Sequence, residues 1–168
     1  MPDAHDAPAA PEEPAGPDAP ATALTVRIPT QLELVRPVRK VIEALLESLG
    51  WSEDDVADVG LVATEVIQNA VEHGSRNDGD ETVDVRCALE GGGLSGALVV
   101  EVRDPGTGKG TESLLDRDVT VPPPEDSSRG RGLYLVHRMA ERLQRARASG
   151  GGSVVRVRLR ASEPQGDL

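Results

Sequence analysis

Alternating apolar and polar residues along the chain predict strands, because successive side chains of a strand point to opposite faces of a sheet. The alternation marks residues 23–28, 82–89, 97–102 and 153–159, with residues 145–148 as a further, shorter candidate. Two triple-glycine stretches, residues 91–93 and 150–152, each precede one of these strands. We therefore expect a hairpin between residues 82–89 and 97–102, and a turn before the last strand.

Apolar residues spaced three or four apart predict three helices, over residues 30–49, 52–73 and 132–143. Thr30 with Glu33 fits a capping box at the start of the first helix, and Ser52 with Asp55 resembles a second cap. Gly74 follows the second helix, at a position where glycine commonly ends a helix. The buried stripe of that helix is expected to consist of Val59, Val62, Val66 and Ala70.

These elements indicate the α+β class. We expect a two-layer α/β sandwich in which helices cover one face of a mixed, mostly antiparallel sheet. Residues 1–22 contain Pro, Ala, Asp and Glu without periodicity, and are expected to be a disordered acidic tail. The folded domain is expected over residues 23–162, and residues 163–168 form a short C-terminal tail. Residues 105–130 form a long loop inside the domain, and loops of that length are usually functional or mobile.

Composition narrows the classes of partner. The 168 residues carry a formal net charge of −11, which argues against sequence-independent binding to nucleic acid and against adsorption to an anionic membrane surface. The single cysteine, Cys87, rules out an intrachain disulfide and is compatible with the reducing cytoplasm. Aromatic residues make up 1% of the chain, so aliphatic side chains must form the core. The three histidines and the cysteine lack the spacing of a zinc site.

Glu65 and Asn69 lie four residues apart in the second predicted helix, so their side chains fall on the same edge of it. A carboxylate beside an amide can position a hydroxyl or a water and can ligate a hard cation, and Mg²⁺ prefers such oxygen ligands. Taken alone, the pair is better explained as an ordinary solvated helix edge.

Two glycine-rich segments follow along the chain. The first, Asp104-Pro-Gly-Thr-Gly108, places a carboxylate at a strand end, where it could accept a hydrogen bond from an exocyclic amine such as that of adenine. The same residues are also common turn chemistry. The second, Gly130-Arg-Gly132, leads into the third predicted helix, whose free N–H groups and dipole attract phosphate. A flexible loop before a capped helix would give the same pattern.

The order of these motifs is more specific than any one of them. Glu-x-x-x-Asn on a helix, Asp-x-Gly-x-Gly after a strand, a long loop and Gly-x-Gly at a helix start together resemble the GHKL ATPases, named for gyrase, heat-shock chaperone, histidine kinase and MutL. Over residues 24–160 the chain is similar, more narrowly, to the bacterial anti-sigma factor serine/threonine kinases. Residues 64–74 are very like the N-box of that subfamily, and residues 130–136 also suit it. The resemblance implies a sandwich of the Bergerat type.

The resemblance also implies roles at the phosphate end of a nucleotide. Glu65 would be the general base that takes the proton from an attacking protein hydroxyl, and Asn69 would ligate magnesium. Gly130 and Gly132 would border the phosphates under a mobile lid.

At the adenine end, the resemblance implies that Asp104 binds the adenine amine and that Gly106 and Gly108 shape that wall. Ser153 would join the nucleotide-binding residues where the family usually has a threonine near the base, and it keeps the hydroxyl. Lys109 and Gly110 depart from the apolar residue that the family has after the second glycine.

The implied function is that of a cytoplasmic, ATP- and Mg²⁺-dependent serine/threonine protein kinase. It would sequester a sigma factor and phosphorylate an anti-sigma factor antagonist, and the family suggests a homodimer. One alternative is a partner-switching kinase of the same build with no sigma factor as target. Another is a regulatory module that binds nucleotide and transfers no phosphate.

Overall fold

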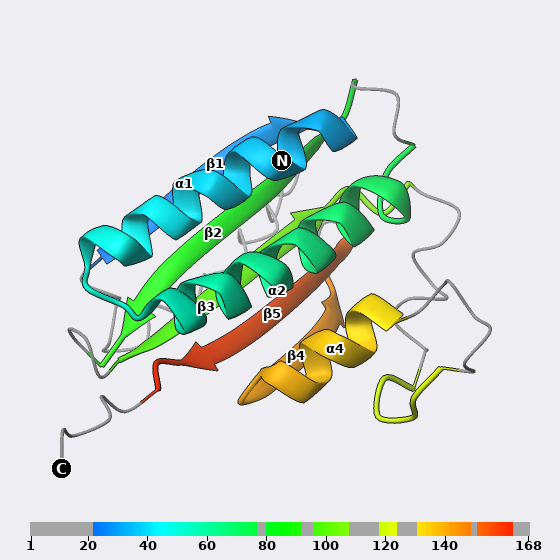
Figure 1. Ribbon diagram of the computed structural model, residues 1–168. Helices are drawn as coiled ribbons and strands as arrows, with labels where there is room; N and C mark the ends of the chain where they lie inside the picture. Colours follow the sequence, from blue (N-terminus) through cyan, green and yellow to red (C-terminus); the bar gives the residue numbers. More distant parts are fainter. Residues whose placement is uncertain are drawn as a thin grey trace, which may run out of the picture.

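The computed structural model describes residues 22–76, 80–91, 96–107, 118–123, 131–148 and 151–162. In chain order its elements are β1 (Thr22–Pro29), η1 (Leu32–Leu34), α1 (Val35–Ser48), α2 (Glu53–Glu72), β2 (Thr82–Glu90), β3 (Ala97–Asp104), α4 (Arg131–Met139), β4 (Arg142–Arg147) and β5 (Ser153–Arg160). They form two layers, with the helices on one face of the sheet (Figure 1). The expected α+β sandwich is confirmed.

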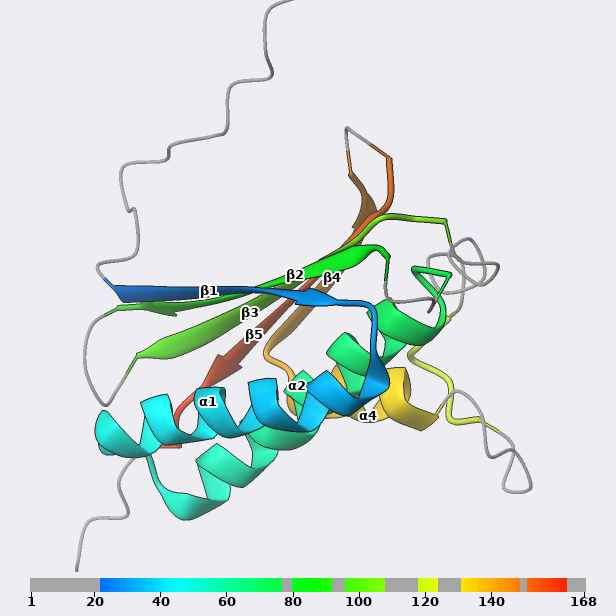
Figure 2. The same cartoon turned by 90° about the horizontal axis from the view of Figure 1, so that it is seen from above.

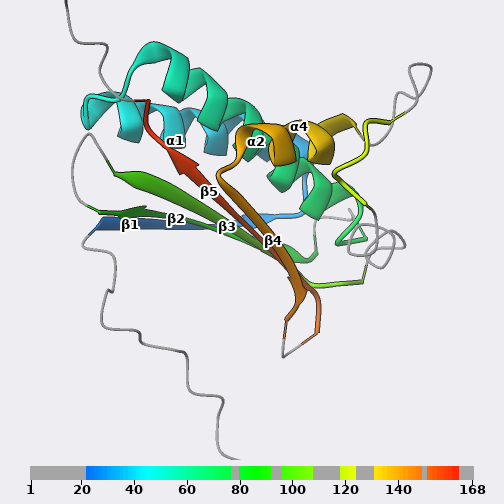
Figure 3. The same cartoon turned by 90° about the horizontal axis from the view of Figure 1, so that it is seen from below.

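The five described strands lie in the order β1-β2-β3-β5-β4, and each pairing between them is antiparallel. Strands β2 and β3 pair from Glu90↔Ala97 to Asp84↔Arg103, as expected for the predicted hairpin. The views from above and below place α1, α2 and α4 on the same side of this twisted sheet (Figures 2 and 3). None of the described helices is long and apolar enough to cross a membrane.

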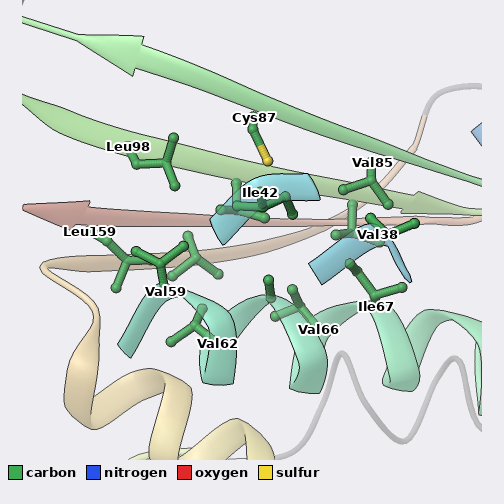
Figure 4. Close-up of a cluster of buried hydrophobic side chains, with 14 of the residues drawn as sticks. Val38, Ile42, Val59, Val62, Val66, Ile67, Val85, Cys87, Leu98 and Leu159 are labelled. Carbon is green, nitrogen blue, oxygen red and sulfur yellow. The ribbon is translucent and has the colours of Figure 1, made fainter. Parts of the chain in front are cut away.

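Aliphatic side chains fill the space between the two layers (Figure 4). Helix α1 contributes Val38 and Ile42, and the strands contribute residues that include Val85, Leu98 and Leu159. The predicted stripe of α2 is buried along its whole length and points into this core. Burying a side chain of this size contributes about 1.5–3 kcal/mol, so the core stabilises α2 directly beneath the edge that carries Glu65.

Helix α2 begins where the sequence predicted. The Ser52 hydroxyl accepts a hydrogen bond from the Asp55 backbone N–H (3.1 Å) and donates one to the Asp55 carboxylate (2.7 Å). Asp55 also accepts from the backbone N–H and the hydroxyl of Ser162, so the last described residue is tied to the start of α2. The helix ends at Glu72 with His73 as its C-cap.

Two local predictions were wrong. The first helix does not begin at Thr30: η1 intervenes, the N-cap positions of η1 and α1 are Gln31 and Leu34, and neither of these two side chains forms a cap hydrogen bond. The third helix ends at Met139 and not at residue 143, because Leu143 lies in β4 opposite Val157. In both cases pairing with a distant segment replaces the local pattern.

Candidate functional site

Helix α4 approaches α2 at Gly132, directly over the carboxylate of Glu65. A methyl group on Gly132 would overlap the Oε2 atom of Glu65 and would lie 2.7 Å from its Cδ atom. Only a glycine at this position leaves Glu65 in the conformation it has. The structure therefore brings together two residues that the sequence assigned to separate motifs.

Asn69 follows Glu65 one turn later on α2. Its side-chain nitrogen is buried and has no hydrogen-bond partner among the described residues. Leaving a buried amide nitrogen unpaired costs roughly 1–3 kcal/mol. Such an unsatisfied amide is a place where an oxygen-rich ligand would gain a hydrogen bond.

Asp104, the last residue of β3, is the centre of a second cluster. Its Oδ1 atom accepts hydrogen bonds from the backbone N–H of Gly106 (2.9 Å) and of Ser153 (3.3 Å). Its Oδ2 atom accepts from the Ser153 hydroxyl. Strands β3 and β5 place these residues together, because Asp104 and Ser153 are directly paired. The carboxylate is thus fixed in orientation and keeps acceptor capacity for a further donor.

Two glycines that the sequence did not assign to the site make room for Asp104. A methyl group on Gly74 would lie 2.5 Å from the Asp104 Cβ atom, and one on Gly152 would overlap the Asp104 carbonyl oxygen. Gly106 and Gly152 both have positive φ, at 72° and 86°, and their backbones touch. Gly74 follows α2, so this contact links the Asp104 cluster to the helix that carries Glu65 and Asn69.

Burial controls the electrostatics of both carboxylates. It raises the pKa of Glu65, and the negative charge of Glu72 on the same helix raises it further. Burial also raises the pKa of Asp104, although hydrogen bonds from Ser153 and Gly106 act in the opposite direction. A carboxylate with a raised pKa is a stronger base than one in water, which suits Glu65 to accepting a proton.

A magnesium ion would find one protein ligand here in the Asn69 amide. No group of three or more His, Cys, Asp or Glu side chains within the described ranges could hold a metal ion. Mg²⁺ often keeps waters and binds mainly through substrate phosphates, with one or two ligands from the protein. The side-chain oxygen of Asn69 could be such a ligand, and the unpaired Asn69 nitrogen could donate to a phosphate oxygen.

A family model described as a histidine kinase-like ATPase domain matches residues 28–159. The chain belongs to this family. Membership implies that the domain binds ATP. The match includes Glu65, Asn69, Asp104, Gly132 and Ser153, and both clusters therefore lie within the family's domain.

Curated relatives include proteins named serine-protein kinase RsbW. Those of Bacillus cereus (strain AH820) and of Bacillus anthracis are each 24% identical to the chain over 125 residues, which is 72% of this chain and 75% of theirs.

Two solved structures share the fold. The RsbU and RsbW domains of Rv1364c from Mycobacterium tuberculosis superpose with a TM-score of 0.61 at 22% identity, covering 87% of this chain and 34% of that one. The chain thus spans about a third of that protein. A chain of the SiaB–SiaC complex from Pseudomonas aeruginosa superposes with a TM-score of 0.63 at 16% identity, and the match covers 81% of this chain and 88% of that chain.

The structure arranges the predicted site residues in two clusters, one around Glu65 and one around Asp104. Asn69 lies on α2, one turn after Glu65 and before Gly74, which contacts Asp104. Glu65 lies against Gly132, and Asp104 binds Gly106 and Ser153. Gly108 and Gly130 lie outside the described residues. The sequence did contain a signal for Gly74, as the glycine that ends the N-box-like segment, but its contact with Asp104 depends on the tertiary structure.

Proposed function

We propose that this chain is an ATP-dependent protein kinase that phosphorylates a serine or threonine hydroxyl of a partner protein. The main support is the contact between Glu65 and Gly132, which joins a half-buried carboxylate to the start of a helix. Helix starts attract phosphate, since their N–H groups and dipole favour negative charge. A base beside a phosphate-binding helix start is the arrangement that phosphoryl transfer needs.

In this proposal the adenine end of ATP binds at Asp104, whose Oδ2 atom accepts from the exocyclic amine. Ser153 and Gly106 hold that carboxylate in place. The Asn69 amide satisfies its unpaired nitrogen against the phosphate end of the nucleotide or ligates Mg²⁺ through its oxygen. Magnesium, when bound, supplies charge neutralisation of the phosphate oxygens.

Glu65 acts on the attacking hydroxyl. The oxygen of the partner's serine or threonine forms a bond to the γ-phosphorus, the bond from that phosphorus to the bridging oxygen breaks, and ADP leaves. The hydroxyl proton passes to the Glu65 carboxylate. The protein contributes chiefly position and electrostatic stabilisation, which dominate phosphoryl transfer.

The partner in this proposal is an anti-sigma factor antagonist, and the chain also sequesters a sigma factor, as a homodimer. The likeness to proteins named serine-protein kinase RsbW supports a protein hydroxyl as the acceptor. The likeness to the SiaB–SiaC complex supports a protein partner. Partners captured from the native cell with and without ATP would identify both proteins.

The test is the variant Glu65→Gln, which keeps the shape of the side chain and loses the proton acceptor. Radiolabel transfer from ATP to the captured partner should fall about 10²–10⁴-fold, the usual contribution of general-base catalysis, while calorimetry shows that Mg-ATP still binds. The matched control is Asp58→Asn, which removes an exposed carboxylate from the same helix and should leave transfer unchanged.

Wild-type transfer by Glu65→Gln would remove Glu65 from the base role. If the unmodified chain binds ATP and its partners but transfers no phosphate, the kinase proposal fails and a nucleotide-dependent binding module takes its place.

A further inference from the structure

Glu81, immediately before β2, joins two segments that are distant in sequence. Its carboxylate accepts a hydrogen bond from the Thr107 hydroxyl, which is shared between Oε1 (2.8 Å) and Oε2 (2.7 Å). It also accepts from the backbone N–H of Arg76 (2.9 Å) and pairs with the Arg76 guanidinium (3.0 Å). Arg76 follows α2, and Thr107 lies in the loop after β3.

The main chain of Glu81 is itself held in place. Its carbonyl oxygen accepts a hydrogen bond from the backbone N–H of Thr30 (3.0 Å), and Thr30 is completely buried. The next residue, Thr82, pairs with Pro29 in the sheet. Glu81 is therefore a fixed point between the sheet and the segment after α2, and Thr107 is attached to it.

Thr107 directly follows Gly106, whose N–H orients Asp104. Gly106 has a positive φ and touches the backbone of Gly152, so its place depends on how the loop is held on both sides. On one side the loop continues from β3. On the other side, the hydrogen bond from Thr107 to Glu81 is the anchor among the described residues.

We propose that Glu81 is a positioning residue for nucleotide binding: by holding Thr107 it sets the Gly106 N–H, and through it the Asp104 carboxylate. The inference rests on the proposed function, in which Asp104 binds the adenine amine. Its scope is specific. Glu81 bears on the adenine end of the site, through its hydrogen bond with Thr107.

Because of this placement, substituting Glu81 should have different kinetic effects from substituting a catalytic residue. We call the hydrogen bond from Thr107 to Glu81 the clamp. Its loss should weaken the binding of ADP and of ATP to the same extent, with or without magnesium, because both nucleotides share the adenine. The rate of phosphate transfer at saturating ATP should remain unchanged while KM for ATP rises. If Glu81 only stabilised the fold, its substitution would lower the melting temperature and would not change KM for ATP separately from the transfer rate.

The experiment uses Thr107→Val, which removes the hydroxyl at nearly constant shape, and Glu81→Ala, singly and together. Calorimetry with ADP in the absence of magnesium should show a three- to tenfold weaker affinity for each, about the contribution of one net hydrogen bond. The double variant should be no weaker than Glu81→Ala, because both changes break one link. Thr107→Ser should restore the wild-type affinity.

The control is Asp84→Ala, which removes the Arg27–Asp84 ion pair on β2 while keeping the Thr107–Glu81 hydrogen bond, and should leave ADP affinity unchanged. Fluorescence of Trp51, the single tryptophan, which is buried, would verify that each variant folds.

Hydrogen exchange of the Gly106 amide provides a readout without nucleotide. That amide should exchange faster in Thr107→Val and Glu81→Ala than in the wild type, and at the wild-type rate in Asp84→Ala. Wild-type ADP affinity in both clamp variants, additive losses in the double variant, or unchanged exchange of Gly106 would overturn the role of Glu81 alone. Failure of the unmodified chain to bind ADP or ATP would instead overturn the proposed function, and the exchange measurement would still decide whether the clamp holds the loop.

Discussion

Asp104→Asn separates nucleotide recognition from folding in one substitution. The asparagine oxygen can still accept from the backbone N–H groups of Gly106 and Ser153, and the Ser153 hydroxyl can rotate to accept from the new amide nitrogen. The adenine amine, however, would meet a donor where it needs an acceptor. Losing a hydrogen bond to a charged group costs roughly 1.5–3 kcal/mol, so ATP affinity should fall by about one to two decades.

The same substitution should not destabilise the unliganded protein at neutral pH. Burial raises the pKa of Asp104 above its usual value of 3.8, so between 3.8 and the raised pKa the native state binds more protons at this group than the unfolded state does. Stability from this group therefore falls as pH rises through that window and stays lower above it. Asparagine carries no charge and escapes this cost.

The assay pairs ATP calorimetry with unfolding followed by Trp51 fluorescence from about pH 4 to pH 7. At pH 7 the variant should be at least as stable as the wild type, and the wild type should gain stability relative to the variant as pH falls toward 3.8. Carboxylates whose pKa is lowered, such as Asp55 and Glu101, are common to both proteins and cancel in the difference. Equal ATP affinity would remove Asp104 from the site, and a large loss of stability at pH 7 would refute the electrostatic reasoning.

Two further substitutions test the phosphate end. Asn69→Ala should reduce the magnesium-dependent part of ATP affinity, measured by titration with Mg²⁺ and with chelator, without lowering the melting temperature, since it removes an unpaired buried amide and alanine favours helix; an unchanged magnesium dependence would contradict the ligand assignment. Gly132→Ala should displace the Glu65 carboxylate and reduce phosphate transfer toward the level of Glu65→Gln, whereas Leu135→Ala, at an exposed position of the same helix, should not. Wild-type transfer by Gly132→Ala would show that the contact is not needed for catalysis.

The sequence by itself determined the elements whose signals are local. Ser52 and Asp55 mark the start of α2 because a helix start leaves N–H groups that nearby side chains must satisfy. Alternation located the strands because strand geometry sends successive residues to opposite faces. The order of the motifs also indicated the family, and the matched family model confirmed it.

Where the next element competes for the same residues, local pattern was not enough. Leu143 fits the periodicity of the third helix, yet it lies in β4 and pairs with Val157 of β5. Thr30 fits a capping box, yet its backbone N–H binds the carbonyl of Glu81. Each outcome depends on a partner far along the chain, and burial or pairing with that partner outweighs a cap or a helix propensity of about 1 kcal/mol.

Tertiary structure alone decided which side chains meet. Ser153 binds Asp104 across 49 residues because β5 lies beside β3 in the sheet. The close approaches of Gly132 to Glu65 and of Gly74 to Asp104 have no local signal, since a glycine in sequence does not say what will occupy the space it leaves. The sequence supplied the chemical groups, and the antiparallel sheet and the packing of α4 on α2 set the distances between them.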